Sequence, residues 1–122
     1  MNKLNDKQIR TKEMTEQYAK LFDIDPLWGD AVALVESSLG LNLKSPTGAR
    51  GVFGMTTIAM KDLLQFMETD ILTGTVCGLL FLRLLLIRWK DFEKATEKFC
   101  DPADRGFYLN RVKEYMRSFG AE

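Results

Sequence analysis

The chain lacks histidine altogether and has only two cysteines, Cys77 and Cys100. The missing imidazole excludes a histidine-based metal site, a Ser-His-Asp triad and a Cys-His dyad. We therefore expect no metal ion and no other cofactor. Both cysteines lie in apolar segments with helical spacing, where thiols are commonly buried, so two buried thiols are favoured over the alternative of a disulfide.

An excess of charge of either sign is also missing, because 17 basic and 17 acidic residues cancel. No polybasic cluster indicates nucleic acid or an anionic membrane as a partner. The N-terminal segment has neither an apolar core nor a small-residue cleavage site, so no secretory signal is expected. The longest apolar run, 76–87, is interrupted by Arg83 and is too short for a bilayer. It predicts a buried core helix and no membrane insertion.

Strand-like alternation is absent as well, and apolar residues recur with helical spacing along the chain. The 122 residues predict one compact all-α domain of about six helices, which we expect to be a monomer. The expected helices run from Asn5 or Asp6 to about Phe22, from Pro26 to a stop at Gly40, from Thr56 or Thr57 to about Met67, from Thr69 or Asp70 to Trp89, from Asp91 to Phe99, and finally through Phe107 to Phe119.

Two features of this pattern concern packing. In the second expected helix, large apolar residues at spacings of four, three and four predict a core stripe, and both tryptophans are expected in the core. Gly74 and Gly78 lie four residues apart, which permits a close helix contact. The stripe comprises Trp28, Val32, Val35 and Leu39, and the second tryptophan is Trp89.

Glu36 is the residue that this pattern does not explain. It lies near the C-terminal end of a largely apolar helix, where apolar neighbours and the helix dipole both favour its protonated form. A protonated carboxyl group suits a general acid. The alternative is a solvated glutamate on the outer face of an amphipathic helix.

The residues after Glu36 add a specific pattern. The sequence reads Glu36-Ser37, then Ser45-Pro46-Thr47-Gly48-Ala49-Arg50-Gly51-Val52-Phe53, Met55-Thr56 and Lys61-Asp62-Leu63. This resembles the lytic transglycosylase family, which is goose-lysozyme-like, with its E-S, its S-x-x-G-A-x-G loop and a following helix in the same register. Segments 78–85 and 108–112 are similar to later helices of that family, so the resemblance covers about residues 28–119.

The chain departs from the family pattern at two places. Most members have glutamine where this chain has Gly54, although the membrane-bound lytic transglycosylase F branch also lacks it and is similar over residues 50–56. The family's Y-N-x-G before the last helix reads Phe99-Cys100-Asp101-Pro102 here. Phe99 can preserve the aromatic packing, whereas the amide contact of the asparagine is lost.

The resemblance implies a lysozyme-like helical fold and a peptidoglycan lytic transglycosylase with Glu36 as its single catalytic acid and base. It implies that Ser37 and Tyr108 lie near that carboxyl group, that Ser45 fixes the loop, that Gly51 lets the backbone approach sugar, and that Phe53 and Met55 line the cleft. Each residue also has a structural alternative: a helix-end serine for Ser37, turn residues for Ser45 and Gly51, and core side chains for the other three.

Two other functions stay open from the sequence. The same acid in a muramidase would admit water and give a reducing sugar, and a non-catalytic glycan-binding or structural module would keep only the scaffold. The implied partner is the glycan strand of peptidoglycan. Without a secretory signal, we expect synthesis in the cytoplasm and action at the periplasmic wall, as in a bacteriophage endolysin or a virion-associated enzyme.

Overall fold

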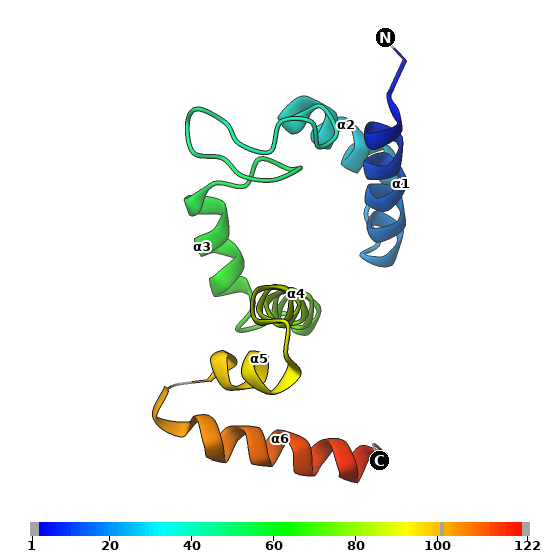
Figure 1. Ribbon diagram of the computed structural model, residues 1–122. Helices are drawn as coiled ribbons and strands as arrows, with labels where there is room; N and C mark the ends of the chain where they lie inside the picture. Colours follow the sequence, from blue (N-terminus) through cyan, green and yellow to red (C-terminus); the bar gives the residue numbers. More distant parts are fainter. Residues whose placement is uncertain (1–2, 101, 121–122) are drawn as a thin grey trace. The chain divides into compact units, whose positions relative to one another are not determined.

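The computed structural model describes residues 3–100 and 102–120. Within these ranges the structure has six α-helices, one short 3-10 helix and no strand, which confirms the all-α prediction (Figure 1). The elements are α1 (Asp6–Leu21), α2 (Pro26–Ser37), α3 (Thr57–Phe66), α4 (Ile71–Trp89), α5 (Phe92–Phe99), η1 (Pro102–Asp104) and α6 (Arg105–Phe119). The more specific lysozyme-like fold stays a prediction.

The chain divides into two compact units, an N-terminal unit that ends at Gln65 and a C-terminal unit that begins at Phe66. The prediction of a single domain stays a prediction.

The starts of α1, α2, α4 and α5 follow from capping side chains. Asn5 caps α1 in a capping box, in which its side chain accepts a hydrogen bond from Gln8 N and the Gln8 side chain accepts one from Asn5 N. Asp25 caps α2 before Pro26, and Asp70 and Asp91 cap α4 and α5 in the same way. The predicted helix starts are therefore confirmed to within about two residues.

In the N-terminal unit, α2 packs on α1 through small residues. A Cβ on Gly29 would lie 3.3 Å from Thr15 Cγ2 and 3.9 Å from Ala19 Cβ. Ala33, one turn further along α2, is completely buried. Because these residues have little or no side chain, the two helices approach closely along this face.

The predicted core stripe is wrong for Trp28 and Val35 of α2. Trp28 is 65% exposed and Val35 is 82% exposed, whereas Leu39 at the end of the stripe is 2% exposed. The buried face of α2 is instead formed by Gly29, Asp30, Ala33 and Ser37. Close approach to α1 requires small residues, so the bulky side chains of α2 lie on the other faces of the helix.

In the C-terminal unit, α5 lies between α4 and α6 and packs against both (Figure 1). Its buried residues Ala95 and Thr96 and the buried Leu85 of α4 form the small core of this unit. The Phe99 ring contacts Phe81 of α4, with ring centroids 5.6 Å apart. No disulfide joins the two cysteines, each of which is half-buried rather than fully buried.

Helix α4 has its predicted bounds to within about two residues. The apolar run 76–87 was expected to be too short for a bilayer, but the whole helix has 19 residues and a mean hydropathy of 1.9, so by length and composition alone it is long and apolar enough to cross a membrane. The run is only part of the helix, because Ile71 and Leu72 lie between it and the cap at Asp70. The predicted buried core helix is also wrong, since only Leu85 of α4 is buried and Trp89 is 38% exposed. A Cβ on Gly78 would meet no atom within 4 Å, so the expected close contact is not formed there.

Candidate functional site

The candidate site begins where α2 ends. Ser38, Leu39 and Gly40 all have left-handed backbone conformations, with φ values of 52°, 54° and 89°. Ser38 N donates to Leu34 O at 3.0 Å and Leu39 N donates to Ala33 O at 3.1 Å, which satisfies the last carbonyl groups of the helix. The predicted stop at Gly40 therefore begins two residues earlier than expected, and Glu36 lies in the last helical turn.

Ser37 is 2% exposed, and its hydroxyl group is engaged by backbone. Its Oγ donates to Ala33 O at 3.1 Å and accepts from Gly40 N at 2.9 Å. This is the helix-end arrangement that was the structural alternative for this residue. The side chain supports the turn after Glu36, and a contact of Ser37 with substrate stays a prediction.

Gln8 is a residue of this site that the sequence did not identify. Its Nε2 donates to Ser38 O at 3.1 Å and so ties the start of α1 to the end of α2, 30 residues away. The capping-box pattern of Asn5 and Gln8 predicts only the helix start. The contact with Ser38 depends on how the two helices cross, which no local pattern encodes.

The loop after α2 is held by its own backbone hydrogen bonds. Arg50 and Met55 exchange two of them, at 2.9 Å and 2.8 Å, and Gly54 N donates to Gly51 O at 3.1 Å across the turn between them. Gly51 N donates to Leu43 O at 2.9 Å and joins this turn to the preceding segment. The loop is therefore a small hydrogen-bonded hairpin that holds Met55, half-buried, at its base.

Ser45 organises the first half of this loop. Its Oγ accepts hydrogen bonds from Thr47 N at 3.2 Å and Ala49 N at 3.0 Å, and its own N–H donates to Ala49 O at 3.0 Å. These bonds form a turn around a serine hydroxyl group. Ser45 therefore holds the turn of this loop through its hydroxyl group, and a contact of Ser45 with substrate stays a prediction.

The carboxylate of Glu36 lies against Gly54 of the hairpin. A Cβ on Gly54 would come within 2.5 Å of Glu36 Oε2 and within 3.3 Å of both Cβ and Cδ of Glu36. Gly54 also has a φ of +61°, in the left-handed region. Position 54 therefore needs glycine both for its backbone conformation and for the space that the glutamate side chain occupies.

The Glu36 side chain is exposed in the N-terminal unit. The prediction that apolar neighbours bury it is therefore wrong within this unit. The reason is the face of α2 that packs on α1, which includes Ala33 and Ser37 and directs Glu36 away from that contact. Among residues 3–100 and 102–120, no hydrogen bond or ion pair engages the carboxylate. Its oxygens are thus accessible beside the hairpin.

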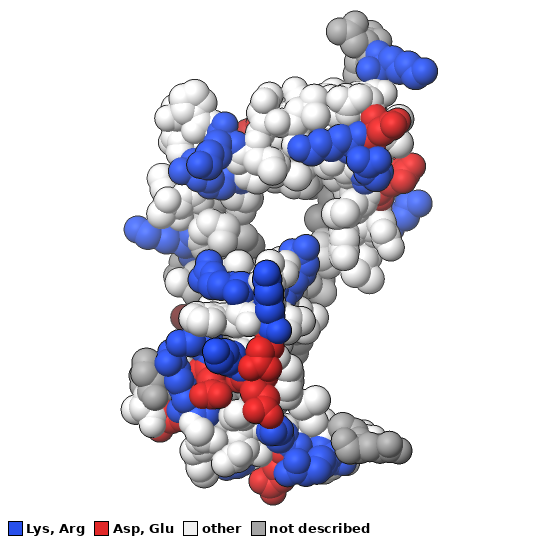
Figure 2. All heavy atoms as spheres, viewed as in Figure 1, with Lys and Arg blue, Asp and Glu red and all other residues white. Residues whose placement is uncertain are grey.

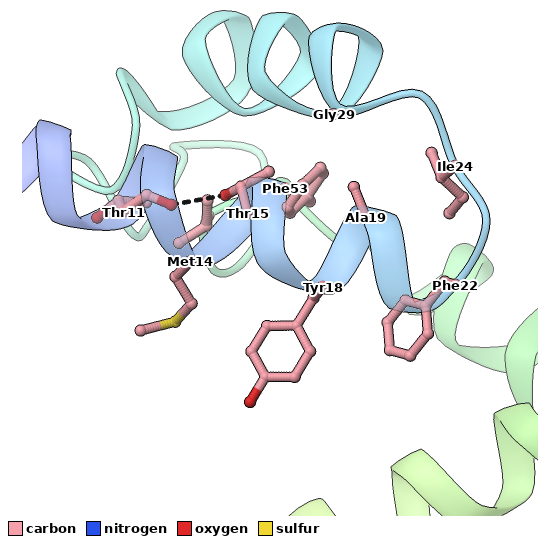
Figure 3. A pocket seen from close by; sticks show the side chains of 10 residues that line it. Thr11, Met14, Thr15, Tyr18, Ala19, Phe22, Ile24, Gly29 and Phe53 are labelled. Atoms are coloured by element: carbon pink, nitrogen blue, oxygen red, sulfur yellow. Dashed lines mark hydrogen bonds between the residues drawn. The ribbon is translucent and has the colours of Figure 1, made fainter.

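Phe53 belongs to an apolar pocket of about 350 Å³ in the N-terminal unit (Figure 3). Half of its lining residues belong to α1, and Thr15 Oγ1 among them donates to Thr11 O at 2.8 Å. The lining residues are Thr11, Met14, Thr15, Tyr18, Ala19, Phe22, Ile24, Gly29, Val52 and Phe53. Phe53 is 39% exposed and, with Val52, brings the hairpin to this pocket.

Tyr108 belongs to the C-terminal unit, where it is half-buried. Its ring stacks on Phe99 with centroids 6.4 Å apart and planes 16° apart. Phe99 therefore keeps an aromatic contact, as expected. Asp101 of the same motif lies outside the described residues, and the nearness of Tyr108 to Glu36 stays a prediction.

Acidic and basic side chains lie side by side on the C-terminal unit (Figure 2), and Lys113 Nζ pairs with Glu93 Oε1 at 2.6 Å. In the part of the chain that the structure describes, no group of three or more cysteine, aspartate or glutamate side chains could hold a metal ion. Comparisons with protein families, with curated proteins and with solved structures find no match to this chain.

Proposed function

We propose that this protein is a peptidoglycan lytic transglycosylase that cleaves the β-1,4 bond between N-acetylmuramic acid and N-acetylglucosamine and forms a 1,6-anhydro product. The observation that carries the proposal is the position of the Glu36 carboxylate against Gly54. Two segments resemble the family, the E-S pair and the glycine-rich loop, and both lie within the N-terminal unit. The Glu36 carboxylate lies against the loop, and no hydrogen bond or ion pair engages it among the residues that the structure describes.

Glu36 would act twice in this reaction. Its carboxylic acid gives a proton to the bridging oxygen while the bond from that oxygen to C1 of the muramic acid breaks, and the N-acetyl oxygen of the same sugar stabilises C1. The C6 hydroxyl oxygen then bonds to C1 and returns its proton to the Glu36 carboxylate. Most glycosidases use a second carboxylate, but here no water is consumed and none has to be activated.

The exposure of Glu36 places a requirement on the substrate. A general acid has to carry its proton when the bond breaks. A glycan strand lying across the hairpin would displace water from Glu36 and favour its protonated form. In this proposal the bound substrate, rather than the free protein, completes the environment of the acid.

The partner in this proposal is the glycan strand of peptidoglycan, and neither nucleic acid nor a cofactor takes part. A monomeric enzyme of this kind, made in the cytoplasm, would act at the periplasmic wall in phage lysis or entry. Within the N-terminal unit, Ser37, Ser45, Gly51, Phe53 and Met55 are the proposed substrate contacts, and a contact of Tyr108 with substrate stays a prediction.

The test compares the wild type with Glu36→Gln on purified cell walls, by loss of turbidity and by mass analysis of the released glycan. We expect the wild type to clear the walls with anhydro ends, and Glu36→Gln to be slower by about 10² to 10⁴. Asp62→Asn, which removes an exposed carboxylate from α3, is the matched control and should keep full activity.

The same experiment separates the alternatives. Ends heavier by one water would identify a muramidase with the same acid. If neither wild type nor Glu36→Gln clears the walls, the enzymatic proposal fails and a non-catalytic module remains. The exposure of Glu36 and the Phe99-Cys100 departure are the observations that favour that module.

A further inference from the structure

We infer that Gly54 is a positioning residue for Glu36: the absence of a side chain at position 54 forms the seat in which the Glu36 carboxylate lies. This inference rests on the proposed function, because positioning matters only if Glu36 is the acid. It assigns the glycine a role other than that of a missing sugar contact.

The hairpin holds the seat in place. The paired hydrogen bonds between Arg50 and Met55 and the bond from Gly54 N to Gly51 O fix the backbone on both sides of Gly54. At the other side, Glu36 extends from the last turn of α2, whose end is fastened by Ser37 and by Gln8. Both backbones are thus restrained, and the carboxylate is the movable part between them.

A methyl group at position 54 would therefore displace the carboxylate and not the loop. The predicted 2.5 Å approach to Oε2 is far inside van der Waals contact, and Oε2 is the far end of a flexible side chain. Rotation of the Glu36 side chain relieves the clash with its carboxyl group, and the 3.3 Å contact with Glu36 Cβ, which rotation does not move, requires a shift of only a few tenths of an ångström. The same rotation moves the acid away from the bond that it must protonate, and a misplacement of about 1 Å can cost about 10² in rate.

The chain offers a matched control for the backbone effect. Gly48 also has a positive φ, +94°, and lies in the same loop, but a Cβ on it would meet no atom within 4 Å. Alanine at either position meets the same kind of left-handed strain, about 1 kcal/mol. Only alanine at position 54 also contacts Glu36. The difference in kcat between the two variants therefore measures the effect of displacing the Glu36 carboxylate.

The first experiment measures kcat and KM of wild type, Gly54→Ala and Gly48→Ala on soluble peptidoglycan fragments, together with their unfolding midpoints. We expect similar midpoints for the two variants. We expect kcat of Gly54→Ala to fall at least tenfold below that of Gly48→Ala, with KM changed less than threefold. Equal kcat values for the two variants would overturn the inference while leaving the proposed function intact.

The second experiment detects the contact between Glu36 and Gly54 without measuring enzyme activity. In amide NMR spectra recorded across an acid titration, the Gly54 resonance should shift as Glu36 ionises, and this shift should disappear in Glu36→Gln, whereas the Gly48 resonance should show no such difference. If the Gly54 resonance shifts in the same way in wild type and Glu36→Gln, the inference that the Glu36 carboxylate lies against Gly54 is overturned. If wild type is inert on walls, the proposed function and the positioning role fail together, and the titration still shows whether the contact exists.

Discussion

The ammonium group of Lys12 lies 3.3 Å from Oδ2 of Asp30 and 2.8 Å from Oε2 of Glu16, so a single cation on α1 joins a carboxylate of its own helix to one of α2. Asp30 is 8% exposed, at the face where the two helices meet. Burial raises the pKa of Asp30, the neighbouring Glu16 carboxyl group raises it further, and Lys12 opposes both. The pKa of Glu16 is lowered by the neighbouring Asp30 and by the hydrogen bond that Glu16 accepts from Lys12.

Asp30→Asn should raise the unfolding midpoint at pH 7. A carboxyl group whose folded pKa is raised contributes stability only where it is protonated, and that contribution is lost as pH rises through the folded pKa. The Asp30 carboxyl group thus lowers the free energy of unfolding as pH rises above the ordinary value, and an amide of equal size removes this loss. The advantage of Asp30→Asn should vanish as pH falls below 3.8, the ordinary value. Thermal unfolding from pH 3 to pH 8 measures this, and a lower midpoint at pH 7 would contradict it.

Lys12→Met should lower the unfolding midpoint at neutral pH. The pKa of Lys12 is raised by its hydrogen bond to Glu16 and then by its ion pair with Asp30. The contribution of Lys12 to stability is therefore complete below the ordinary value of 10.5 and is lost as pH rises through the higher folded pKa. The difference in unfolding midpoint between wild type and Lys12→Met should therefore close only above pH 10.5. In the Asp30→Asn background this difference in midpoint should be smaller at every pH. An equal difference in both backgrounds would show that the Lys12–Asp30 pair contributes nothing to stability.

Ser37→Ala should destabilise the protein by about 1 to 3 kcal/mol in denaturant unfolding, because it leaves the buried N–H of Gly40 without an acceptor. The turn that follows Glu36 loses its support at the same time. Ser118→Ala, an exposed position in α6, is the control and should change stability by less than about 0.5 kcal/mol. An equally small effect of Ser37→Ala would mean that water replaces its hydroxyl group.

Gly29→Leu should destabilise the protein by about 1 to 3 kcal/mol, because its side chain has to fit where Thr15 already lies 3.3 Å from the Cβ position. Gly106→Ala is the contrasting change. Gly106 lies in α6 with no atom within 4 Å of its Cβ position, so alanine should stabilise the helix by about 0.5 to 1 kcal/mol. Chemical unfolding of the two variants measures both effects, and a tolerated leucine at position 29 would argue against the close packing of α1 and α2.

Vesicle flotation tests whether α4 enters a bilayer. We expect the protein to stay in the aqueous fraction, since Arg83 lies within α4 and a guanidinium group in hydrocarbon costs about 3 kcal/mol. The variant Arg83→Leu removes that cost and should float more readily. Flotation of the wild type with neutral and anionic vesicles alike would show instead that the exposed apolar surface of α4 binds lipid.

Local chemistry made the helices of this protein predictable. The caps at Asn5, Asp25, Asp70 and Asp91 act within three residues along the chain, so their signals are complete in the sequence. The same holds for the glycine-rich loop, whose turns depend on nearby hydroxyl groups and on positive φ. Glu36 could be selected for the same reason, as a carboxyl group at the end of an apolar helix.

The faces that these helices bury were decided by tertiary structure. Hydrophobicity predicted that Trp28 and Val35 of α2 face the core, but α1 packs on the side of Gly29 and Ala33, because only small residues allow the two backbones to approach. The contact of Lys12 with Asp30 follows from that crossing, and the contact of Glu36 with Gly54 follows from the way the hairpin folds back on the end of α2. Each joins residues well separated along the chain, and the free energy that selects such pairs depends on the packing of whole elements and not on neighbours in sequence.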